Sequence, residues 1–287
     1  MTGIISFIIL HYMAIEETIA CVESIQKMET QDRIRIVIVD NASPNGSGEI
    51  LQKKYKEDLN IQVILNTENA GFSRGNNIGC LYAKKKWNCD FYVITNNDII
   101  FIQEDFYKRV YDEYRNKEFE VLGMDIYCPN KRIHQSPLGK LIPTTKIIKR
   151  TIMINKVMLY FFDFLYPIIY MYYKKIDGCG HNAIGYDKYQ ENVCVMGACM
   201  VLSTKYMNRR EMPFWPETEF YYEEFLLSVW CRENNARLVY QPAIEVLHNE
   251  GTATKQARKK YKDRVKYRIN CIINSAEVLK RELLKTE

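Results

Sequence analysis

The first hundred residues of the chain alternate between patterns of buried strands and patterns of amphipathic helices. Continuous apolar runs, which are typical of strands buried on both faces, occupy Ile4–Leu10, Ile34–Val39, Ile61–Leu65 and Phe91–Thr95. Segments with helical spacing of apolar residues separate these runs, at residues 14–28, at Glu49–Lys56 and from about Ser73 to Lys85. Strand–helix alternation of this length predicts a parallel, doubly wound α/β sheet.

The second half of the chain has a less regular pattern. Lys140–Lys175 begins basic and becomes strongly apolar and aromatic, and Asp163 and Pro167 interrupt its apolar part. That part is too short to span a bilayer, whereas basic flanks with interleaved Tyr and Phe are typical of a segment lying at a membrane interface. The alternative is a buried helical insertion. Beyond it we expect a strand at Val193–Leu202, a helix at Phe220–Asn234, a strand at Arg237–Tyr240 and a basic C-terminal helix.

Composition narrows the class of protein. The 287 residues are 47% hydrophobic and 26% charged, which is typical of a globular protein. Nine cysteines are scattered singly and form no C-x-x-C motif, which argues against a disulfide framework or structural zinc and favours reduced thiols in a cytosolic protein. The first apolar run lacks a basic flank and a cleavage site, so it predicts a strand and not a signal peptide.

The net charge of +5 is unevenly distributed. Lys255–Arg268 carries eight basic residues and one acidic residue, and could face nucleic acid, anionic lipid or phosphate, or be a solvated helix face. We expect no nucleic-acid partner, because the chain lacks a helix-turn-helix, zinc or aromatic-sheet motif.

Polar residues follow the predicted strands. In doubly wound sheets ligands bind at the carboxyl ends of the strands. Those ends carry His11-Tyr12, Asp40-Asn41, Asn66–Asn69 and Asn96-Asn97-Asp98. The chain has no G-x-G-x-x-G and no Walker lysine loop, which argues against dinucleotide oxidoreductases and P-loop phosphotransferases.

Two of these strand ends suit a nucleotide. Asp40 can accept hydrogen bonds from a base imide or from ribose hydroxyls, or it can simply cap the following turn. The segment Asn69–Asn77 has two glycines that permit close backbone approach. In it, Arg74 can pair with phosphate, and a helix that begins near Ser73 would present free N–H groups to an anion.

Acidic residues supply candidates for metal binding and catalysis. Asp98 at a strand end can bind a hard divalent ion with support from Asn96. The adjacent acids Glu223 and Glu224 lie on an apolar, aromatic segment, where a less solvated carboxylate gains a raised pKa suited to a general base. The alternative is an ordinary acidic helix N-terminus. His248 can be a metal or phosphate ligand, or a polar residue with ordinary partners.

The ordered set of motifs resembles the family 2 glycosyltransferases, inverting enzymes with the glycosyltransferase A fold, over about residues 1–255. The matching segments are SFIILHY, IVIVDNAS, NAGFSRGNN, ITNNDI, VMGACMVLS, FYYEE and HNEGT. Members close to this pattern include rhamnosyl-, galactosyl- and glucosyltransferases that assemble bacterial surface polysaccharides. The implied fold is a doubly wound, mostly parallel sheet with a helical, partly membrane-facing insertion and a C-terminal helix.

The resemblance also implies residue roles. Glu224 matches the usual base of an acidic pair, with Glu223 as the second choice. Asp98 matches the last acid of a D-x-D-like motif whose first position here is Asn96. The expected ligands of Mn²⁺ or Mg²⁺ are Asp98 and His248. The expected donor-binding residues are His11, Tyr12, Asp40, Asn69, Gly71, Arg74, Asn76 and Asn97.

These roles predict transfer of a hexose of the rhamnose, galactose or glucose type from a dTDP- or UDP-sugar, with inversion. The acceptor is expected to be a hydroxyl of a lipid-linked oligosaccharide in capsule, O-antigen or cell-wall polysaccharide synthesis. We expect a cytoplasmic protein that is peripheral at the inner face of the cell membrane, with a homodimer left open. The alternative function is a non-catalytic nucleotide-binding or scaffolding subunit of a polysaccharide assembly complex.

The expected organisation has three parts. Residues 1–130 would form the nucleotide-sugar-binding half, and residues 131–254 the acceptor-binding half with a helical insertion near 140–175. Residues 255–287 would form the basic C-terminal helix.

Overall fold

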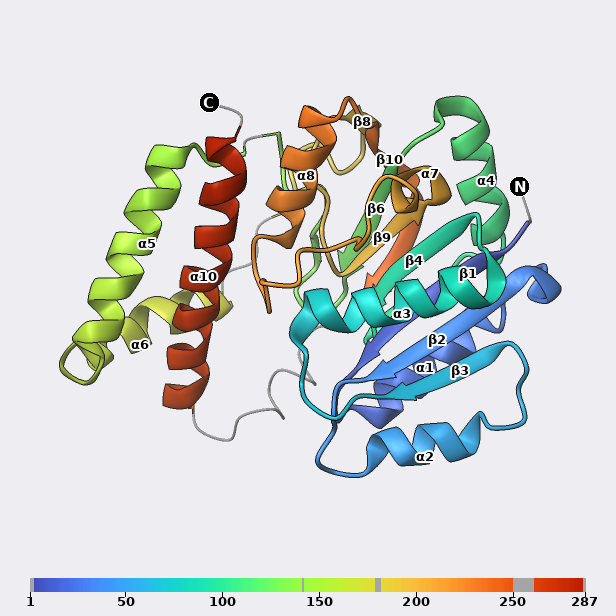
Figure 1. The fold of residues 1–287 in the computed structure, drawn as a ribbon, viewed down its shortest axis with the longest axis horizontal. Helices are drawn as coiled ribbons and strands as arrows, with labels where there is room; N and C mark the ends of the chain where they lie inside the picture. Colours follow the sequence, from blue (N-terminus) through green and yellow to red (C-terminus); the bar gives the residue numbers. More distant parts are fainter. Residues whose placement is uncertain (1–2, 141, 179–181, 250–260, 286–287) are drawn as a thin grey trace.

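A computed structural model describes residues 3–140, 142–178, 182–249 and 261–285. Ten strands in these residues form one sheet with helices on both faces (Figure 1). The strands are β1 (Ile5–His11), β2 (Ile34–Asp40), β3 (Ile61–Leu65), β4 (Phe91–Asn96), β5 (Ile99–Phe101), β6 (Val121–Cys128), β7 (Ile133–His134), β8 (Gln190–Glu191), β9 (Cys199–Ser203) and β10 (Leu238–His248).

The helices cover the sheet and extend beyond it. They are α1 (Ile15–Ile25), α2 (Ser47–Lys54), α3 (Gly71–Trp87), α4 (Phe106–Lys117), α5 (Thr145–Tyr160), α6 (Phe162–Gly178), α7 (Thr204–Met207), α8 (Glu223–Glu233) and α10 (Tyr261–Leu284). One face of the sheet packs against apolar residues of α1 and α4, and the other against those of α3, α7 and α8. The core therefore has two layers on either side of the sheet.

The sheet order is β3-β2-β1-β4-β9-β6-β10-β5, with β7 paired to β6 and β8 paired to β10. Strands β3, β2, β1 and β4 are parallel, as expected for apolar strands joined by crossover helices. Strand β9 is antiparallel to both of its neighbours, β4 and β6. The predicted doubly wound, mostly parallel α/β sheet is confirmed, and residues before and after 130 share it.

Three predicted elements have different bounds. The strand expected at Val193–Leu202 begins only at Cys199, after a turn at Gly197-Ala198. The helix expected from Phe220 begins at Glu223, because Tyr221 and Tyr222 have positive φ angles of 71° and 69°. The strand expected at Arg237–Tyr240 continues to His248, through a register shift between Gln241 and Glu245.

Helices α5, α6 and α10 form a group beside the sheet, with α8 between them and the strands (Figure 1). Ile148 and Ile152 of α5 pack with Leu279 of α10, and Phe162 and Ile169 of α6 pack with other apolar residues of α10. The basic segment Lys255–Arg268 is described only from Tyr261 onward, where α10 begins. Within the described residues, no helix combines the length and apolarity needed to cross a membrane.

The cysteines of the described residues are eight, all buried and none in a disulfide. Burial raises the pKa of several of these thiols, among them Cys89 and Cys194, each to about 12. At neutral pH they are therefore un-ionised apolar side chains of the core.

Candidate active site

The carboxyl ends of β1, β2 and β4 lie side by side at one edge of the sheet. His11 is in register with Asp40, and Leu10 is in register with Asn96. The polar residues that follow these strands in the sequence are thereby brought together, as the strand-end rule predicts.

Asp40 lies almost fully buried at the end of β2, with 3% of its surface exposed. Its Oδ1 accepts a hydrogen bond of 2.5 Å from the Ser43 hydroxyl, and the Ser43 N–H lies 3.2 Å from Oδ2. The carboxylate thus caps the turn after β2. It is also positioned beside the start of α2, where a bound nucleotide would meet the strand ends.

His11 is a support for this turn and has no surface exposed for a direct donor contact. Its Nδ1 lies 2.7 Å from Thr18 Oγ1 and its Nε2 lies 2.8 Å from Ser47 Oγ. Burial lowers the pKa of His11, and the nearby carboxylate of Asp40 partly opposes that shift. The expectation that His11 binds the donor is therefore corrected to a positioning role, because both ring nitrogens are already engaged.

Asn97 has a similar supporting place. Its side-chain amide donates to Ala14 O at 3.2 Å and to Thr18 Oγ1 at 3.0 Å. With 5% of its surface exposed, it joins the end of β4 to α1 and does not face a ligand directly. Tyr12, by contrast, is half-exposed at the end of β1, where its ring is open to contact.

The segment after β3 is held to the sheet by Asn41, a residue that the sequence analysis did not assign to the site. The Asn41 amide donates to Gly71 O at 3.0 Å, and its Oδ1 accepts from Ala70 N at 3.1 Å. Gly71 has a φ of +70°, and a Cβ there would lie 2.8 Å from the carbonyl oxygen of Glu219. Glycine is required because the backbone of another segment approaches so closely.

The start of α3 is less open to an anion than the sequence suggests. The Gly71 N–H donates to Asn69 Oδ1 at 3.0 Å, and the Phe72 N–H donates to Glu219 O at 2.6 Å. Two of the N–H groups expected to be free are therefore occupied, and the helix begins at Gly71 instead of Ser73. Asn69 caps this turn from an exposed position.

Three further polar residues of α3 have different environments. Arg74 is half-exposed, with its Nε donating to Ala70 O at 3.2 Å and a guanidinium nitrogen 3.6 Å from Glu68. Asn76 is fully buried and donates to Phe72 O at 2.9 Å, so the expectation that it binds the donor is corrected. Asn77 pairs with both backbone polar groups of Phe214, at 2.9 Å each, and is structural.

Asp98 and His248 form a pair at the far end of this edge. Strand β5 runs antiparallel to β10, which sets Ile99 opposite His248 and brings Asp98 Oδ1 to 3.2 Å from His248 Nε2. The other ring nitrogen, Nδ1, lies 2.6 Å from Gln135 Oε1. Because an amide oxygen only accepts, Nδ1 carries the proton, and a neutral ring directs its Nε2 lone pair toward Asp98.

This pair fits a divalent cation. Two lone pairs that face each other need a proton or a metal ion between them. Adjacent ligands of an octahedral ion lie about 3 Å apart when each is about 2.1 Å from the metal. Carboxylate and imidazole suit Mn²⁺, and a diphosphate would complete its coordination. Within the described residues, no group of three or more His, Cys, Asp or Glu side chains is arranged to hold a metal.

Glu223 and Glu224 open α8 directly after Tyr221 and Tyr222. Glu223 is 5% exposed and its Oε1 has no hydrogen-bond partner within the described residues. Burial, followed by the charge of Glu224, raises the pKa of Glu223 well above its usual value, although hydroxyls of Thr218 and Ser73 oppose this. Glu223 is therefore the more strongly protonated acid of the two.

Glu224 is half-buried and its Oε1 accepts a hydrogen bond from the Gly197 N–H at 3.2 Å. Burial raises the pKa of Glu224 as well, against the lowering effect of this bond. The neighbouring Ala198 carbonyl accepts from the Asn96 N–H at 2.9 Å. The turn at Gly197-Ala198 thus joins Glu224 to the strand end that carries Asp98, a link that no sequence spacing indicates.

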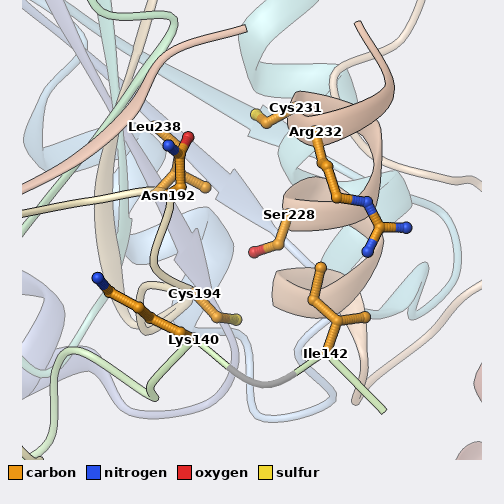
Figure 2. A pocket seen from close by; sticks show the side chains of 8 residues that line it. All are labelled: Lys140, Ile142, Asn192, Cys194, Ser228, Cys231, Arg232 and Leu238. Atoms are coloured by element: carbon orange, nitrogen blue, oxygen red, sulfur yellow. The ribbon is translucent and has the colours of Figure 1, made fainter. Parts of the chain in front are cut away.

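A pocket of about 320 Å³ lies along α8, between that helix and the segment before β9 (Figure 2). Its walls include Ser228, Cys194 and the cationic residues Lys140 and Arg232. The Ser228 hydroxyl donates to Glu224 O at 2.8 Å, so the pocket begins one helical turn beyond Glu224. Its lining includes none of the expected donor-binding residues, and it is distinct from the strand-end edge.

Comparison with known proteins adds three findings. The family model described as Glycosyl transferase family 2 matches residues 6–185. Glycosyltransferase GlyG of Streptococcus pneumoniae serotype 4 is 26% identical over 127 residues, which cover 44% of this chain and 40% of that protein. The chain therefore matches only about two fifths of that relative's length.

Solved structures of TarS from S. aureus share the fold. The crystal structure of TarS 1-349 matches with a TM-score of 0.55 at 14% identity, and covers 98% of this chain and 70% of that one. TarS 1-349 in complex with UDP-GlcNAc matches with a TM-score of 0.56 at 15% identity, over 98% and 71% of the two chains. The expected glycosyltransferase fold is confirmed at this level.

Proposed function

This chain belongs to glycosyl transferase family 2, and we propose that it transfers a sugar from a nucleotide-sugar donor to a hydroxyl group of a saccharide acceptor. The observation that carries the proposal is the link between Glu224 and the strand-end edge through Gly197-Ala198. A carboxylate with a raised pKa and a cation site are thereby held in one framework. That combination suits acceptor activation beside a departing diphosphate.

The proposed donor is a dTDP- or UDP-linked hexose of the rhamnose, galactose or glucose type. Asp40 at the end of β2 would accept hydrogen bonds from the base or the ribose, and the half-exposed Tyr12 ring would pack against the nucleoside. Arg74 is near enough to the turn after β3 to pair with phosphate. The TarS complexes with UDP and UDP-GlcNAc support a uridine diphosphate donor.

In the proposed reaction Glu224 removes the proton from the acceptor hydroxyl. The new bond forms between the acceptor oxygen and the anomeric carbon as the bond from that carbon to the diphosphate breaks. The electron pair leaves with the nucleoside diphosphate, and the anomeric configuration inverts. When bound by Asp98 and His248, Mn²⁺ or Mg²⁺ supplies positive charge that stabilises the diphosphate. Glu223, held protonated by burial, keeps the start of α8 in place.

We further propose that the acceptor is a lipid-linked oligosaccharide of bacterial surface-polysaccharide synthesis, handled at the inner face of the cell membrane. The family and the named relatives support a role in glycan assembly. A scaffolding subunit that only binds nucleotide would have no use for the raised pKa of Glu224.

The test begins with thermal stabilisation by a panel of dTDP- and UDP-sugars, including UDP-GlcNAc, with and without Mn²⁺. The stabilising donor is then incubated with protein, and released nucleoside diphosphate is measured for the wild type and for Glu224→Gln. We expect release by the wild type only. Donor binding without release by either protein would favour the scaffolding subunit, and a chain that binds no nucleotide sugar would contradict the proposal.

A further inference from the structure

Helices α5 and α6 expose large apolar side chains on their outer side. Phe164 is 84% exposed, Tyr160 82%, Met171 71% and Ile168 68%. We call the set Ile154, Val157, Tyr160, Phe164, Ile168 and Met171 the apolar face. Single exposed apolar residues are ordinary, but a contiguous set on two consecutive helices is typical of an interaction surface.

The apolar face lies opposite the side by which these helices join the fold. On α6, Phe162, Ile169 and Tyr173 are buried against α10, whereas Phe164, Ile168 and Met171 are exposed. At about 100° per residue these two triplets lie on opposite sides of the helix. The same division holds on α5, where Ile148 and Ile152 are buried and Ile154 and Val157 are exposed. Packing within the fold therefore leaves the apolar face uncovered.

Positive charge surrounds the apolar face. Residues 142–176 contain six basic residues and one acid. The acid, Asp163, pairs with Lys262 Nζ of α10 at 2.7 Å. The six basic residues are all exposed: Lys146, Lys149, Arg150, Lys156, Lys174 and Lys175. Apolar and aromatic residues flanked by cations fit the boundary between the headgroups and acyl chains of an anionic membrane.

We propose that the apolar face is a docking surface for an anionic lipid bilayer. Phe164, Ile168 and Met171 enter the headgroup region, and the surrounding lysines and arginine contact lipid phosphates. A second copy of the chain is the less favourable occupant, because two apposed faces would bring like charges together. The inference rests on the proposed function, in which the acceptor is lipid-linked.

The docking helices also contact the loop that carries the two acids. The Arg268 guanidinium of α10 lies 4.9 Å from the Tyr173 ring of α6 and 5.5 Å from the Tyr221 ring. Tyr222 packs against the cluster that contains Ile148 of α5. A bilayer held on the outer side of these helices is therefore connected through one layer of side chains to the start of α8. A lipid-linked acceptor would be presented on the same side as Glu224.

The test is co-sedimentation of the full chain with vesicles of phosphatidylcholine alone or mixed with phosphatidylglycerol. We expect binding only to the anionic vesicles, weakening as salt rises. The double variant Phe164→Ser, Ile168→Ser should lower the vesicle partition coefficient about tenfold or more. Leu59→Ser is the matched control, because Leu59 is 92% exposed far from α5 and α6, between α2 and β3. The control should bind as the wild type does.

Two outcomes would overturn the inference. One is a wild type that stays in the supernatant with anionic vesicles at physiological salt. The other is a double variant that changes the oligomeric state in sedimentation velocity but keeps vesicle binding, which would assign the face to a second copy. Donor hydrolysis without vesicles is measured on the same proteins. Its absence in the wild type would contradict the proposed function and leave the docking result intact.

Discussion

The Gly197 N–H donates to Glu224 Oε1 at 3.2 Å, and a Cβ at position 197 would lie 2.6 Å from that same oxygen. Glycine at this turn therefore provides both the hydrogen bond and the space for the carboxylate. The bond favours the ionised acid, whereas burial disfavours it, and burial is the larger effect on the pKa of Glu224. The result is a fixed carboxylate that is more basic than an exposed one.

Replacing Glu224 by Gln should lower kcat by a factor of about 10² to 10⁴, because the amide cannot accept the acceptor's proton. Donor affinity, measured by titration calorimetry, should stay within about threefold of the wild type. Glu223→Gln is the matched control, since Gln mimics the protonated acid that burial maintains there. If Glu223→Gln loses activity and Glu224→Gln keeps it, the two roles are reversed.

Gly197→Ala should reduce kcat more than the KM for the donor, because its Cβ displaces the Glu224 carboxylate. Shortening the acid tests this cause directly. In the double variant with Glu224→Asp, the alanine no longer meets the carboxylate, so the two losses should be markedly less than additive. Additive losses in initial-rate kinetics would show that residue 197 acts by some other route.

Activity and stability should respond to pH in opposite directions. The raised pKa of Glu224 means that transfer increases as pH rises through that pKa, when the base loses its proton. Glu223 binds its proton more tightly in the folded state than in the unfolded state. Its contribution to stability is complete below its unfolded value of 4.5 and is lost as pH rises through the raised folded pKa.

Glu223→Gln should accordingly flatten the decline in melting temperature between acidic and alkaline pH. At pH 8 we expect the variant to melt about 2–4 °C above the wild type, and at pH 4 to melt close to it. Differential scanning calorimetry across this range supplies the measurement. An unchanged slope would mean that Glu223 does not titrate as a buried acid.

Asp98→Asn should weaken Mn²⁺-dependent donor binding, because it removes the single carboxylate of the proposed cation pair. Gln135→Ala should have a related but smaller effect, about 10- to 100-fold on metal affinity, since Gln135 fixes the His248 ring. Titration calorimetry with nucleotide, with and without Mn²⁺, separates the two contributions. Equal affinities in both conditions for the wild type would remove the metal from the proposal.

Asn77→Ala should destabilise the protein by about 2–3 kcal/mol, since it leaves the N–H and the carbonyl of Phe214 without their partner. Ile78→Ala is the control, because Ile78 is the next residue of α3 and is 36% exposed. Urea unfolding should show a much smaller loss for Ile78→Ala. Similar losses would mean that the pairing with Phe214 contributes little.

The fold of the first hundred residues could be predicted because its signals are local. Apolar runs such as Ile34–Val39 report strands buried on both faces, and the rule for strand ends then groups Asp40 with Asn96. Between residues 99 and 139 the same reasoning assigned no element. Strand β5 has only three residues, and helix α4 is mostly charged, so neither gives a long apolar run.

The site was predicted less completely, because its geometry depends on contacts between distant segments. The N–H groups at the start of α3 are free in the sequence pattern, yet Glu219 O occupies one of them. His11 and Asn76 are polar residues in suitable positions, but both are fully buried. Asn41 and Gly197 lie within the motifs quoted from the sequence, and only the folded chain shows what each of them contacts.

Strand β9 lies between β4 and β6, and it is the last of the three to be synthesised. A growing chain on the ribosome therefore holds two apolar strands with open backbone edges for more than seventy residues before the strand that joins them emerges. A fragment that ends with the family match at residue 185 would remain in that state permanently. We expect such a fragment to aggregate, and the nascent full-length chain to depend on chaperones until Ser203 has left the exit tunnel.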